Sequence, residues 1–539
     1  MEKELIAMAT NMIASVFLAG FLMVFLYLYE CLFLKPKRLR SKFEKQGIKG
    51  PSPSIFLGNI PEIKKIQLKL QNSSSSTKTT KPAHDDHQPA SNSFIPVIVH
   101  DWPSTIFSHL YQWLAQYGPN FIYSTGNIHL LCITDAEVVK ELSHCTSLSL
   151  GKPSYQPKER GPLLGQGIAT SNGPIWAHQR KIIAPEFYFD KVKGMVNIMV
   201  ESTSSMLRSW ETKIKSEKGG IAEIKIDEDL KNLSADIISR ACFGSNYSQG
   251  EQIFLKLRTL QNIMSKKFNG IPGSRYMPTK TNREIWRLEK EIQTMILQLV
   301  KHREETTYEK DLLQMILEGA KNYGDIDRQC LGMTRDKFIV DNCKTIYLAG
   351  HETIATTASW SLMLLAANPE WQARARAEVL KICRGGIPDA DMLPSMKTLS
   401  MVIYETLRLY PPSAFVIRET FQDIKLKDIV IPKGTNIQIP IAILHHIPNL
   451  WGPDAKEFNP QRFQNGIPGA SKIPQAFIPF GVGTRICVGQ RLALTQLKLI
   501  LSLILSNFSF SLSPSYQHSP TCRLFIEPRN GINLQVRRL

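Results

Sequence analysis

The stretch Phe480-Gly-Val-Gly-Thr-Arg-Ile-Cys-Val-Gly489 decides the fold, because it places one cysteine in a glycine-rich loop directly before a long apolar segment. As an axial ligand to haem iron, a cysteine thiolate donates electron density that favours cleavage of an O–O bond. Gly483 and Gly489 let the backbone approach where a side chain would collide. A helix predicted from about Val488 to Phe508 points its first amides toward Cys487 and stabilises an anionic sulfur. The loop therefore predicts a thiolate ligand to haem iron.

The other side chains of this loop have assignable roles. Phe480 can pack over the sulfur and exclude water, and Arg485 can bind a haem carboxylate. The pattern Phe-x-x-Gly-x-Arg-x-Cys-x-Gly resembles the haem loop of the cytochrome P450 family, and its fixed positions are Phe480, Gly483, Arg485, Cys487 and Gly489. The alternative is a buried structural cysteine beside a glycine turn, which the filled pattern disfavours.

The resemblance has consequences for the whole chain. It implies a mainly α protein with small β-sheets (α+β), the cytochrome P450 fold, preceded by one N-terminal transmembrane helix. It also implies haem b as cofactor, Cys487 as the metal ligand, and electrons from NADPH through NADPH–cytochrome P450 reductase. The implied reaction inserts one oxygen atom from O2 into a C–H bond. No flavin or nicotinamide domain is recognisable in the sequence, so the electrons come from this partner.

The spacing of apolar residues agrees with that fold. From about Pro103 to Lys397 it predicts helices almost throughout, including Phe338 to Ala366 and Leu399 to Leu409. Between Phe415 and Ala442 the pattern alternates, as in strands. Residues 523–536, divided at Asn530-Gly531, predict a C-terminal hairpin.

Composition excludes several other classes of protein. The nine cysteines include no Cys-x-x-Cys pair, which argues against a zinc site, a disulfide framework and covalent c-type haem. The chain of 539 residues carries a net charge of +18, which suits nucleic acid, an anionic membrane or an acidic protein. No nucleic-acid motif supports the first of these, so we expect no nucleic-acid partner.

The N-terminus contains a candidate membrane span. Residues 12–29 carry no charge, and extension to Leu34 past Glu30 gives the roughly 20 residues that cross a bilayer core. Seven lysines and arginines follow between Lys35 and Lys49. By the positive-inside rule, residues 1–11 are luminal, 12–34 are the anchor, and the remainder is cytosolic. This arrangement resembles microsomal members of the family and implies a single-pass protein of the endoplasmic reticulum membrane.

The remaining chain divides into a hinge and a body. Residues 35–60 form a hinge that is basic and then rich in proline, and we expect its part from Lys49 to Asn59 to act as a stiff elbow between the anchor and the body. Residues 61–539 form the predicted haem-thiolate monooxygenase domain. Within it, 71–94 are almost wholly polar and predict a flexible low-complexity insertion.

A second motif, Ala349-Gly-His-Glu-Thr353, lies in a predicted long helix. Ala349 and Gly350 let a flat ligand approach the backbone and can loosen one helical turn. Glu352 and Thr353 supply an acid and an alcohol, which suit proton delivery to dioxygen. The motif resembles the oxygen-activating motif of the family, in which both residues are catalytic and the position of His351 varies.

Further positions match the family by resemblance. Trp176 and Arg180, four residues apart, match a Trp-x-x-x-Arg pair at the haem edge, and Arg418 falls where another arginine binds a haem carboxylate. Glu405 and Arg408 match a Glu-x-x-Arg pair that interlocks with an arginine in a later Phe-x-Pro-x-Arg-Phe segment. In this sequence that arginine is Arg462, and the triad would be structural.

The substrate is the least predictable part. Resemblance places the pocket near Ile346 and Thr353, at 414–416 and near 519–521, and its first two regions are mostly apolar. The local sequences 167–186 and 516–520 resemble a plant clan that contains gibberellin-oxidising and triterpenoid-oxidising members.

Several functions remain open at this stage. A pentacyclic triterpenoid acid of the oleanane or ursane type is preferred as substrate. The alternative is a gibberellin or ent-kaurenoid diterpenoid that is hydroxylated or epoxidised. A hydroperoxide-rearranging haem-thiolate enzyme and a non-enzymatic haem or terpenoid sensor are disfavoured by Glu352 and Thr353. The partners expected are the reductase, membrane lipid and a lipophilic terpenoid.

Overall fold

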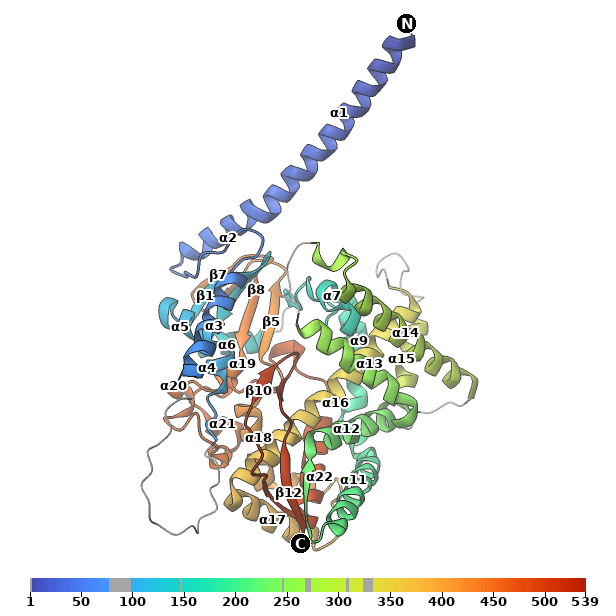
Figure 1. Ribbon diagram of the computed structural model, residues 1–539, viewed down its shortest axis with the longest axis vertical. Helices are drawn as coiled ribbons and strands as arrows, with labels where there is room; N and C mark the ends of the chain where they lie inside the picture. Colours follow the sequence, from blue (N-terminus) through green and yellow to red (C-terminus); the bar gives the residue numbers. More distant parts are fainter. Residues whose placement is uncertain are drawn as a thin grey trace.

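Helices make up most of the chain, which confirms the prediction of a mainly α protein with small sheets (Figure 1). The computed structural model describes residues 2–76, 98–145, 148–244, 247–266, 273–306, 310–322 and 333–539. The longer helices are α1 (Glu2–Tyr29), α2 (Lys35–Glu44), α3 (Ile60–Ser76), α5 (Ser108–Tyr117), α6 (Ala136–His144), α9 (Gly173–Ile183), α11 (Val196–Ser216), α12 (Ile226–Phe243), α13 (Tyr247–Ser265), α14 (Lys280–Thr306), α15 (Leu312–Asn322), α16 (Arg335–Ala367), α17 (Pro369–Cys383), α18 (Lys397–Leu409) and α22 (Gln490–Asn507). Short helices are α4 (Trp102–Ile106), α7 (Gln156–Glu159), α8 (Gly161–Leu164), α10 (Phe189–Gly194), α19 (Ile441–Leu444), α20 (Pro448–Trp451) and α21 (Gly466–Ala470).

The strands of the described residues form small sheets. The largest sheet has the order β1-β2-β8-β5-β3, a second has the order β4-β12-β9, and the pairs β6-β7 and β10-β11 stand alone. The strands are β1 (Asn120–Thr125), β2 (Ile128–Ile133), β3 (Leu150–Gly151), β4 (Ile221–Lys225), β5 (Phe415–Thr420), β6 (Ile424–Leu426), β7 (Ile429–Ile431), β8 (Asn436–Pro440), β9 (Phe508–Leu512), β10 (Pro520–Cys522), β11 (Ile526–Pro528) and β12 (Asn533–Arg538).

The region 103–397 is mainly helical, as predicted, and the short strands β1, β2, β3 and β4 interrupt it. Most residues of β1 and β2 are buried, so no alternating pattern marks them. The predicted hairpin over 523–536 was wrong. Strand β11 pairs with β10, whereas β12 pairs with β4 and β9, because Asn530-Gly531 turns the chain into a different sheet.

Helix α16 is the core around which the other helices pack. The Thr334 hydroxyl caps it by accepting a hydrogen bond from the Lys337 amide at 3.3 Å, and Pro369 follows its end. Most of its residues are buried, and it contacts α12, α18 and α22. A helix that is apolar on almost every face must lie inside the protein, as α16 does.

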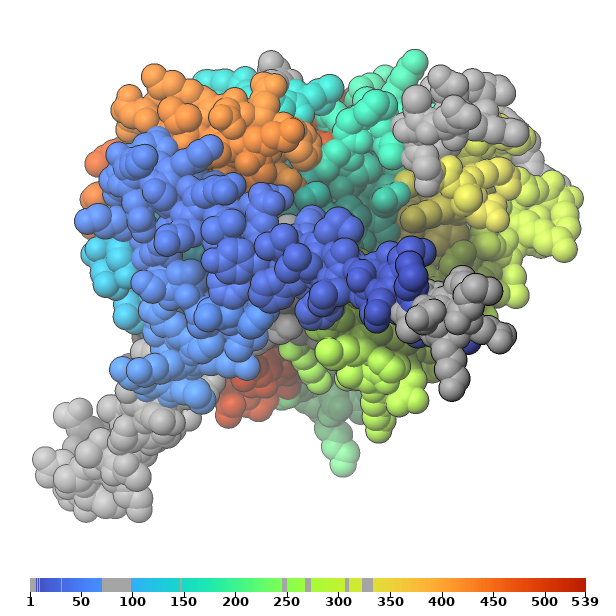
Figure 2. Space-filling view, turned by 90° about the horizontal axis from the view of Figure 1, so that it is seen from above, coloured from blue at the N-terminus to red at the C-terminus, as the bar shows by residue number. Residues whose placement is uncertain are grey.

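The N-terminal helix projects from the body (Figure 1). A helix spanning Thr10–Glu44 is long and apolar enough to cross a membrane, and its most apolar part is fully exposed. The face from which α1 leaves includes the N-terminal segment and, beside it, chain coloured yellow-green that includes α14 (Figure 2). A single apolar helix thus stands outside the packed body.

The hinge and the insertion differ in part from expectation. A π-helical turn at Glu30–Leu34 joins α1 to α2, so the basic first part of the hinge 35–60 is helical. The irregular chain begins only after α2, where Pro51 and Pro53 lie. Helix α3 continues to Ser76, so the start of the predicted insertion 71–94 is helical. The rest of that prediction, 77–94, lies outside the described residues.

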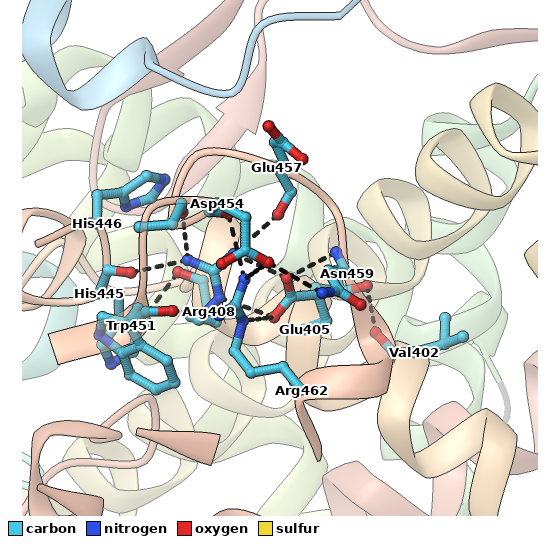
Figure 3. A network of polar contacts seen from close by, with 12 residues as sticks. Val402, Glu405, Arg408, His445, His446, Trp451, Asp454, Glu457, Asn459 and Arg462 are labelled. Carbon is cyan, nitrogen blue, oxygen red and sulfur yellow. Dashed lines mark hydrogen bonds and ion pairs between the residues drawn. The ribbon is translucent and has the colours of Figure 1, made fainter. Parts of the chain in front are cut away.

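The Glu405 and Arg408 side chains form a fully buried ion pair in α18 (Figure 3). The Arg408 guanidinium donates to both carboxylate oxygens of Glu405 at 2.7 Å. It also donates to three backbone carbonyls, those of His445 at 2.9 Å, Ala455 at 2.6 Å and Glu457 at 3.0 Å. These are the contacts of a fully buried group, as a structural triad requires.

Arg462 and His445 extend this network. Arg462 Nε lies 3.7 Å from Glu405 Oε2, and its Nη2 donates to Asp454 at 2.8 Å. His445 Nδ1 lies 3.2 Å from the Arg408 carbonyl, while the Ile478 amide donates to His445 Nε2 at 3.1 Å. Burial lowers the pKa of His445 to about 3, so the ring is neutral and can accept that bond. His445 thereby ties the triad to the segment that leads into the cysteine loop.

Glu405→Gln tests the importance of the buried pair. The substitution leaves the Arg408 charge buried without its carboxylate, so we expect a loss of about 3–5 kcal/mol in the free energy of unfolding. Denaturant unfolding followed by circular dichroism measures it. Arg287→Ala is the control, since it removes an exposed ion pair with Glu284 and should leave stability unchanged. A small effect of Glu405→Gln would contradict the structural role.

Candidate active site

The cysteine loop is shaped by short backbone hydrogen bonds. The Cys487 amide donates to the Phe480 carbonyl at 2.9 Å, and the Ile486 amide donates to that of Gly483 at 3.1 Å. Gly483 has a φ of +65°, and a Cβ there would lie 3.4 Å from the carbonyl oxygens of Leu142 and Cys145. The loop therefore lies tightly against the end of α6 and turns Cys487 toward a cavity.

This cavity has a volume of about 370 Å³ and lies between α16, α9, β5 and the cysteine loop. Of the sequence-predicted residues, it brings together Cys487, Phe480, Arg485, Gly489, Trp176, Arg180, Arg418, Ala349, Gly350 and Thr353. Gly483 lies outside it and shapes the loop. Ile346, Phe415 and Val416 form part of its apolar wall, as expected, whereas the predicted contacts near 519–521 do not line it.

Burial raises the pKa of the Cys487 thiol, although the Gly489 amide and the charges of Arg180 and Lys152 act in the opposite direction. A metal ion deprotonates a coordinating thiol outright. Among the described residues, no group of three or more His, Cys, Asp or Glu side chains could hold a metal ion.

Four cationic side chains line the cavity, and no carboxylate does: Lys152, Arg180, Arg418 and Arg485. Among the described residues, none of the four forms an ion pair with an acidic side chain. Burial, with help from neighbouring arginines, lowers the pKa of Lys152 to about 7 and that of Arg485 to about 9. Burial also lowers the pKa of Arg418 to about 10. Such a set fits a ligand with more than one negative charge.

Arg485 is the best-fixed of these cations. Its Nη1 donates to the Ser171 carbonyl at 2.8 Å and its Nη2 to Asn172 Oδ1 at 2.7 Å, and its guanidinium lies 3.8 Å from the centre of the Trp176 ring. Its buried Nε has no hydrogen-bond partner. Trp176 therefore orients a charge at the cavity edge, a role that sequence spacing assigned only by resemblance.

Lys152 was missed by sequence reasoning. It directly follows β3, and the lone Lys in Gly151-Lys152-Pro153 carries no pattern that distinguishes it from a surface lysine. Only the pairing of β3 with β5 brings it to the cavity that Arg418 also lines. No local signal could have identified it.

Gly350 also has a packing role that the sequence did not suggest. A Cβ at this position would lie 2.6 Å from Ile238 Cδ1, so the glycine allows α12 to pack closely on α16. Helix α16 continues through Ala349 and Gly350 without a break, and the expected loosened turn is absent from it. Both residues still line the cavity.

The predicted pair Glu352 and Thr353 is divided between two faces of α16. Thr353 lines the cavity, and its hydroxyl donates to the Ala349 carbonyl at 2.7 Å. Glu352 does not line the cavity, because adjacent helical residues point about 100° apart. Instead Glu352 Oε1 lies 3.2 Å from His351 Nε2, and Oε2 lies 3.9 Å from Lys231 Nζ.

The surroundings of Glu352 keep it ionised. Burial alone would raise the pKa of Glu352, but His351, Lys231 and Arg258 outweigh it and lower the pKa to about 2. Lys231 Nζ also lies 3.5 Å from Glu527 Oε2 on β11, which in turn lies 3.1 Å from the partly exposed Arg523. The acid is thus the inner end of a chain of charges that leads to the surface.

The comparisons with known proteins agree with this geometry. A sequence model of cytochrome P450 matches residues 95–536. The chain belongs to the cytochrome P450 family. Cytochrome P450 714C2 of Oryza sativa subsp. japonica is 51% identical over 523 residues, 96% of each chain. Cytochrome P450 714A2 of Arabidopsis thaliana is 44% identical, covering 99% of this chain and 100% of that protein. Cytochrome P450 714B3 of Zea mays is also 44% identical, covering 99% and 97%.

Membership of the cytochrome P450 family establishes the class of reaction. The protein is a plant cytochrome P450 monooxygenase of the 714 group, with haem b as cofactor and electrons from a reductase. Bound haem supplies the activation of dioxygen. The cavity fits this group, since it combines one thiol, several unpaired cations and an apolar wall on α16.

Glu352→Gln tests the ionised state of the buried acid. A lowered pKa means that the carboxylate stabilises the fold above its ordinary pKa of 4.5 and loses this effect as the pH falls toward 2. We therefore expect a loss of about 3 kcal/mol at neutral pH that shrinks as the pH falls from 4.5 toward 2. Denaturant unfolding at neutral and at acidic pH measures it, with the exposed Glu228→Gln as control. A loss that did not shrink at acidic pH would contradict a stabilising role for the ionised carboxylate.

Proposed function

We propose that this monooxygenase inserts oxygen into a C–H bond of a lipophilic plant terpenoid, a pentacyclic triterpenoid acid of the oleanane or ursane type. The observation that carries the proposal is the lining of the cavity. Apart from its cations, the wall is formed mainly by apolar side chains and a few hydroxyls. The four cations outnumber the two carboxylates of haem, so a carboxylate on the substrate also finds a partner.

In this proposal, the residues of the cavity would hold the haem. Cys487 would supply the thiolate ligand to its iron, and Phe480 would cover the sulfur. Arg180, Arg418 and Arg485 would bind the haem carboxylates, with Trp176 orienting Arg485. Ala349 and Gly350 would leave space for the haem against α16, while Gly483 and Gly489 shape the cysteine loop.

Thr353 and Glu352 have different parts in proton delivery. The Thr353 hydroxyl lies on the cavity wall and, by turning away from the Ala349 carbonyl, can donate a hydrogen bond to a reacting oxygen. Glu352 acts from behind the wall, as the ionised end of the chain through Lys231. Glu405, Arg408 and Arg462 hold the core and take no part in chemistry.

The exposed side of the cysteine loop suits an electron donor. A hollow beside Cys487 is lined by Arg180, Lys181 and Arg491, and it includes the exposed ring of Tyr188. We assign this face to the acidic surface of NADPH–cytochrome P450 reductase. The assignment explains part of the net charge of +18.

The proposed location is the endoplasmic reticulum membrane. Residues 12–34 cross the bilayer once, 1–11 lie in the lumen, and the body from 61 onward lies in the cytosol, joined through 35–60. The cluster of lysines and arginines after the span favours this orientation.

Thr353→Ala tests the role of the hydroxyl. The variant keeps an apolar side chain on the wall, so we expect it to bind substrate as the wild type does. Proton delivery fails, and more than half of the NADPH consumed appears as hydrogen peroxide rather than product. Peroxide and product are measured against NADPH oxidation, with Thr357→Ser as a control on the same helix. Tight coupling in Thr353→Ala would remove this residue from the mechanism.

A substrate panel tests the proposed substrate. Microsomes containing the protein, a reductase and NADPH should oxidise oleanane- or ursane-type acids and show little turnover of gibberellin precursors, as mass spectrometry can measure. Cys487→Ser is the matched control, which should lose both product and the red-shifted carbon monoxide band of the reduced protein. Preferential turnover of gibberellin precursors would replace the proposed substrate with a diterpenoid.

A further inference from the structure

One wall of the cavity comes from irregular chain. Segment 161–169, which comprises α8 and the turns after it, lies along the N-terminal half of α16, and its last residues, Ile168 and Ala169, line the cavity. Irregular chain inside a protein must find partners for its backbone groups outside any helix or sheet. Neighbouring residues of the segment supply many of these partners, and four more are side chains of α16.

Two backbone amides of segment 161–169 donate to neighbouring residues of α16. The Gln166 amide donates to Asp341 Oδ2 at 2.8 Å, and the Ile168 amide donates to Asn342 Oδ1 at 3.0 Å. Both acceptors are buried. The amide next to the cavity wall is therefore held by a single side chain of the helix.

Two backbone carbonyls of the same segment accept from the next turn of α16. Lys344 Nζ donates to the Gly161 carbonyl at 3.4 Å. The Thr345 hydroxyl donates to the Asp341 carbonyl of its own helix at 2.9 Å and shares this hydrogen with the Leu164 carbonyl at 3.3 Å. Within five consecutive positions, α16 thus contacts four backbone groups of the segment.

The segment also lies too close to α16 for ordinary side chains. A Cβ at Gly165 would lie 2.0 Å from Asp341 Cγ, and the residue has a φ of +56°. A Cβ at Gly167 would lie 2.4 Å from both the Asp341 carbonyl oxygen and Thr345 Oγ1. Glycine is required at both positions for this approach.

Asp341 and Asn342, the two acceptors, are themselves held in place by further contacts. Asn342 Nδ2 donates to the Phe338 carbonyl at 2.9 Å, and Asp341 Oδ1 lies 3.0 Å from Lys344 Nζ. On the far side of the segment, Gln179 of α9 donates to the Gln166 carbonyl at 2.9 Å. The wall is therefore fixed between two helices.

We propose that Asp341 and Asn342 are positioning residues that hold Ile168 and Ala169 as a rigid wall, and that this wall selects fused-ring substrates over flexible chains. The inference rests on the proposed function for its substrate class. A rigid wall gains most from a rigid ligand, since neither has to be ordered on binding. A flexible acyl chain can adapt its own conformation to the wall, whether the wall is rigid or mobile.

The first test follows the segment itself. In the haem-loaded protein, Asn342→Ala removes the acceptor of the Ile168 amide, and Gly167→Ala pushes the segment away from α16. We expect peptides covering 161–170 to exchange deuterium about tenfold faster in both variants. Ser359→Ala is the matched control, because the buried Ser359 hydroxyl donates only to the Ala355 carbonyl of its own helix. Wild-type exchange in both variants would overturn the proposal.

The second test follows selectivity. For an oleanane-type acid, Asn342→Ala should raise KM about tenfold and change kcat less, while the Soret shift produced by lauric acid, a flexible probe, stays as in the wild type. An equal weakening toward both ligands would overturn the proposal. A wild type that oxidises no fused-ring acid would overturn the proposed function instead, and the exchange measurement would still decide whether Asp341 and Asn342 fix the wall.

Discussion

The buried ion pair between Glu405 and Arg408 is the interaction on which the arrangement of the site depends. Arg408 donates to the carbonyls of three residues between 445 and 457, a region with little regular structure, and so it replaces the hydrogen bonds that a sheet would supply. His445 extends this network, because it accepts a hydrogen bond from the amide of Ile478, which lies just before the cysteine loop. Two charges in α18 thereby fix irregular chain that carries the predicted iron ligand, although neither touches the cavity.

Different faces of helix α16 have different roles. One face presents Thr353 to the cavity, another buries Glu352 against Lys231, and its N-terminal part holds segment 161–169. A single long helix suits this division, since its residues keep fixed angles to one another. Gly350 adds to this division, because the absence of a side chain there lets α12 pack closely on α16.

The sequence predicts the parts of this molecule that are encoded locally. The loop around Cys487 is identifiable because its glycines, its arginine and its cysteine act together within ten residues, and the long helices are identifiable from their apolar spacing. Strands β1 and β2 could not be predicted, because they are buried on both faces and so show no alternation of apolar and polar residues. The place of Lys152 in the cavity could not be predicted either, because only strand pairing brings it there. The position of Glu352 behind the wall depends on the rotation of α16, which no motif specifies.

The hydrogen bonds from α16 to segment 161–169 involve the backbone of the segment and not its side chains. Asp341 and Asn342 accept from peptide N–H groups, which every residue except proline possesses. The residues at positions 168 and 169 can therefore change during evolution without loss of the bonds that hold them. Substitutions at these two positions can therefore change which substrates fit the wall. The two glycines and helix α16, which support the wall, can stay the same.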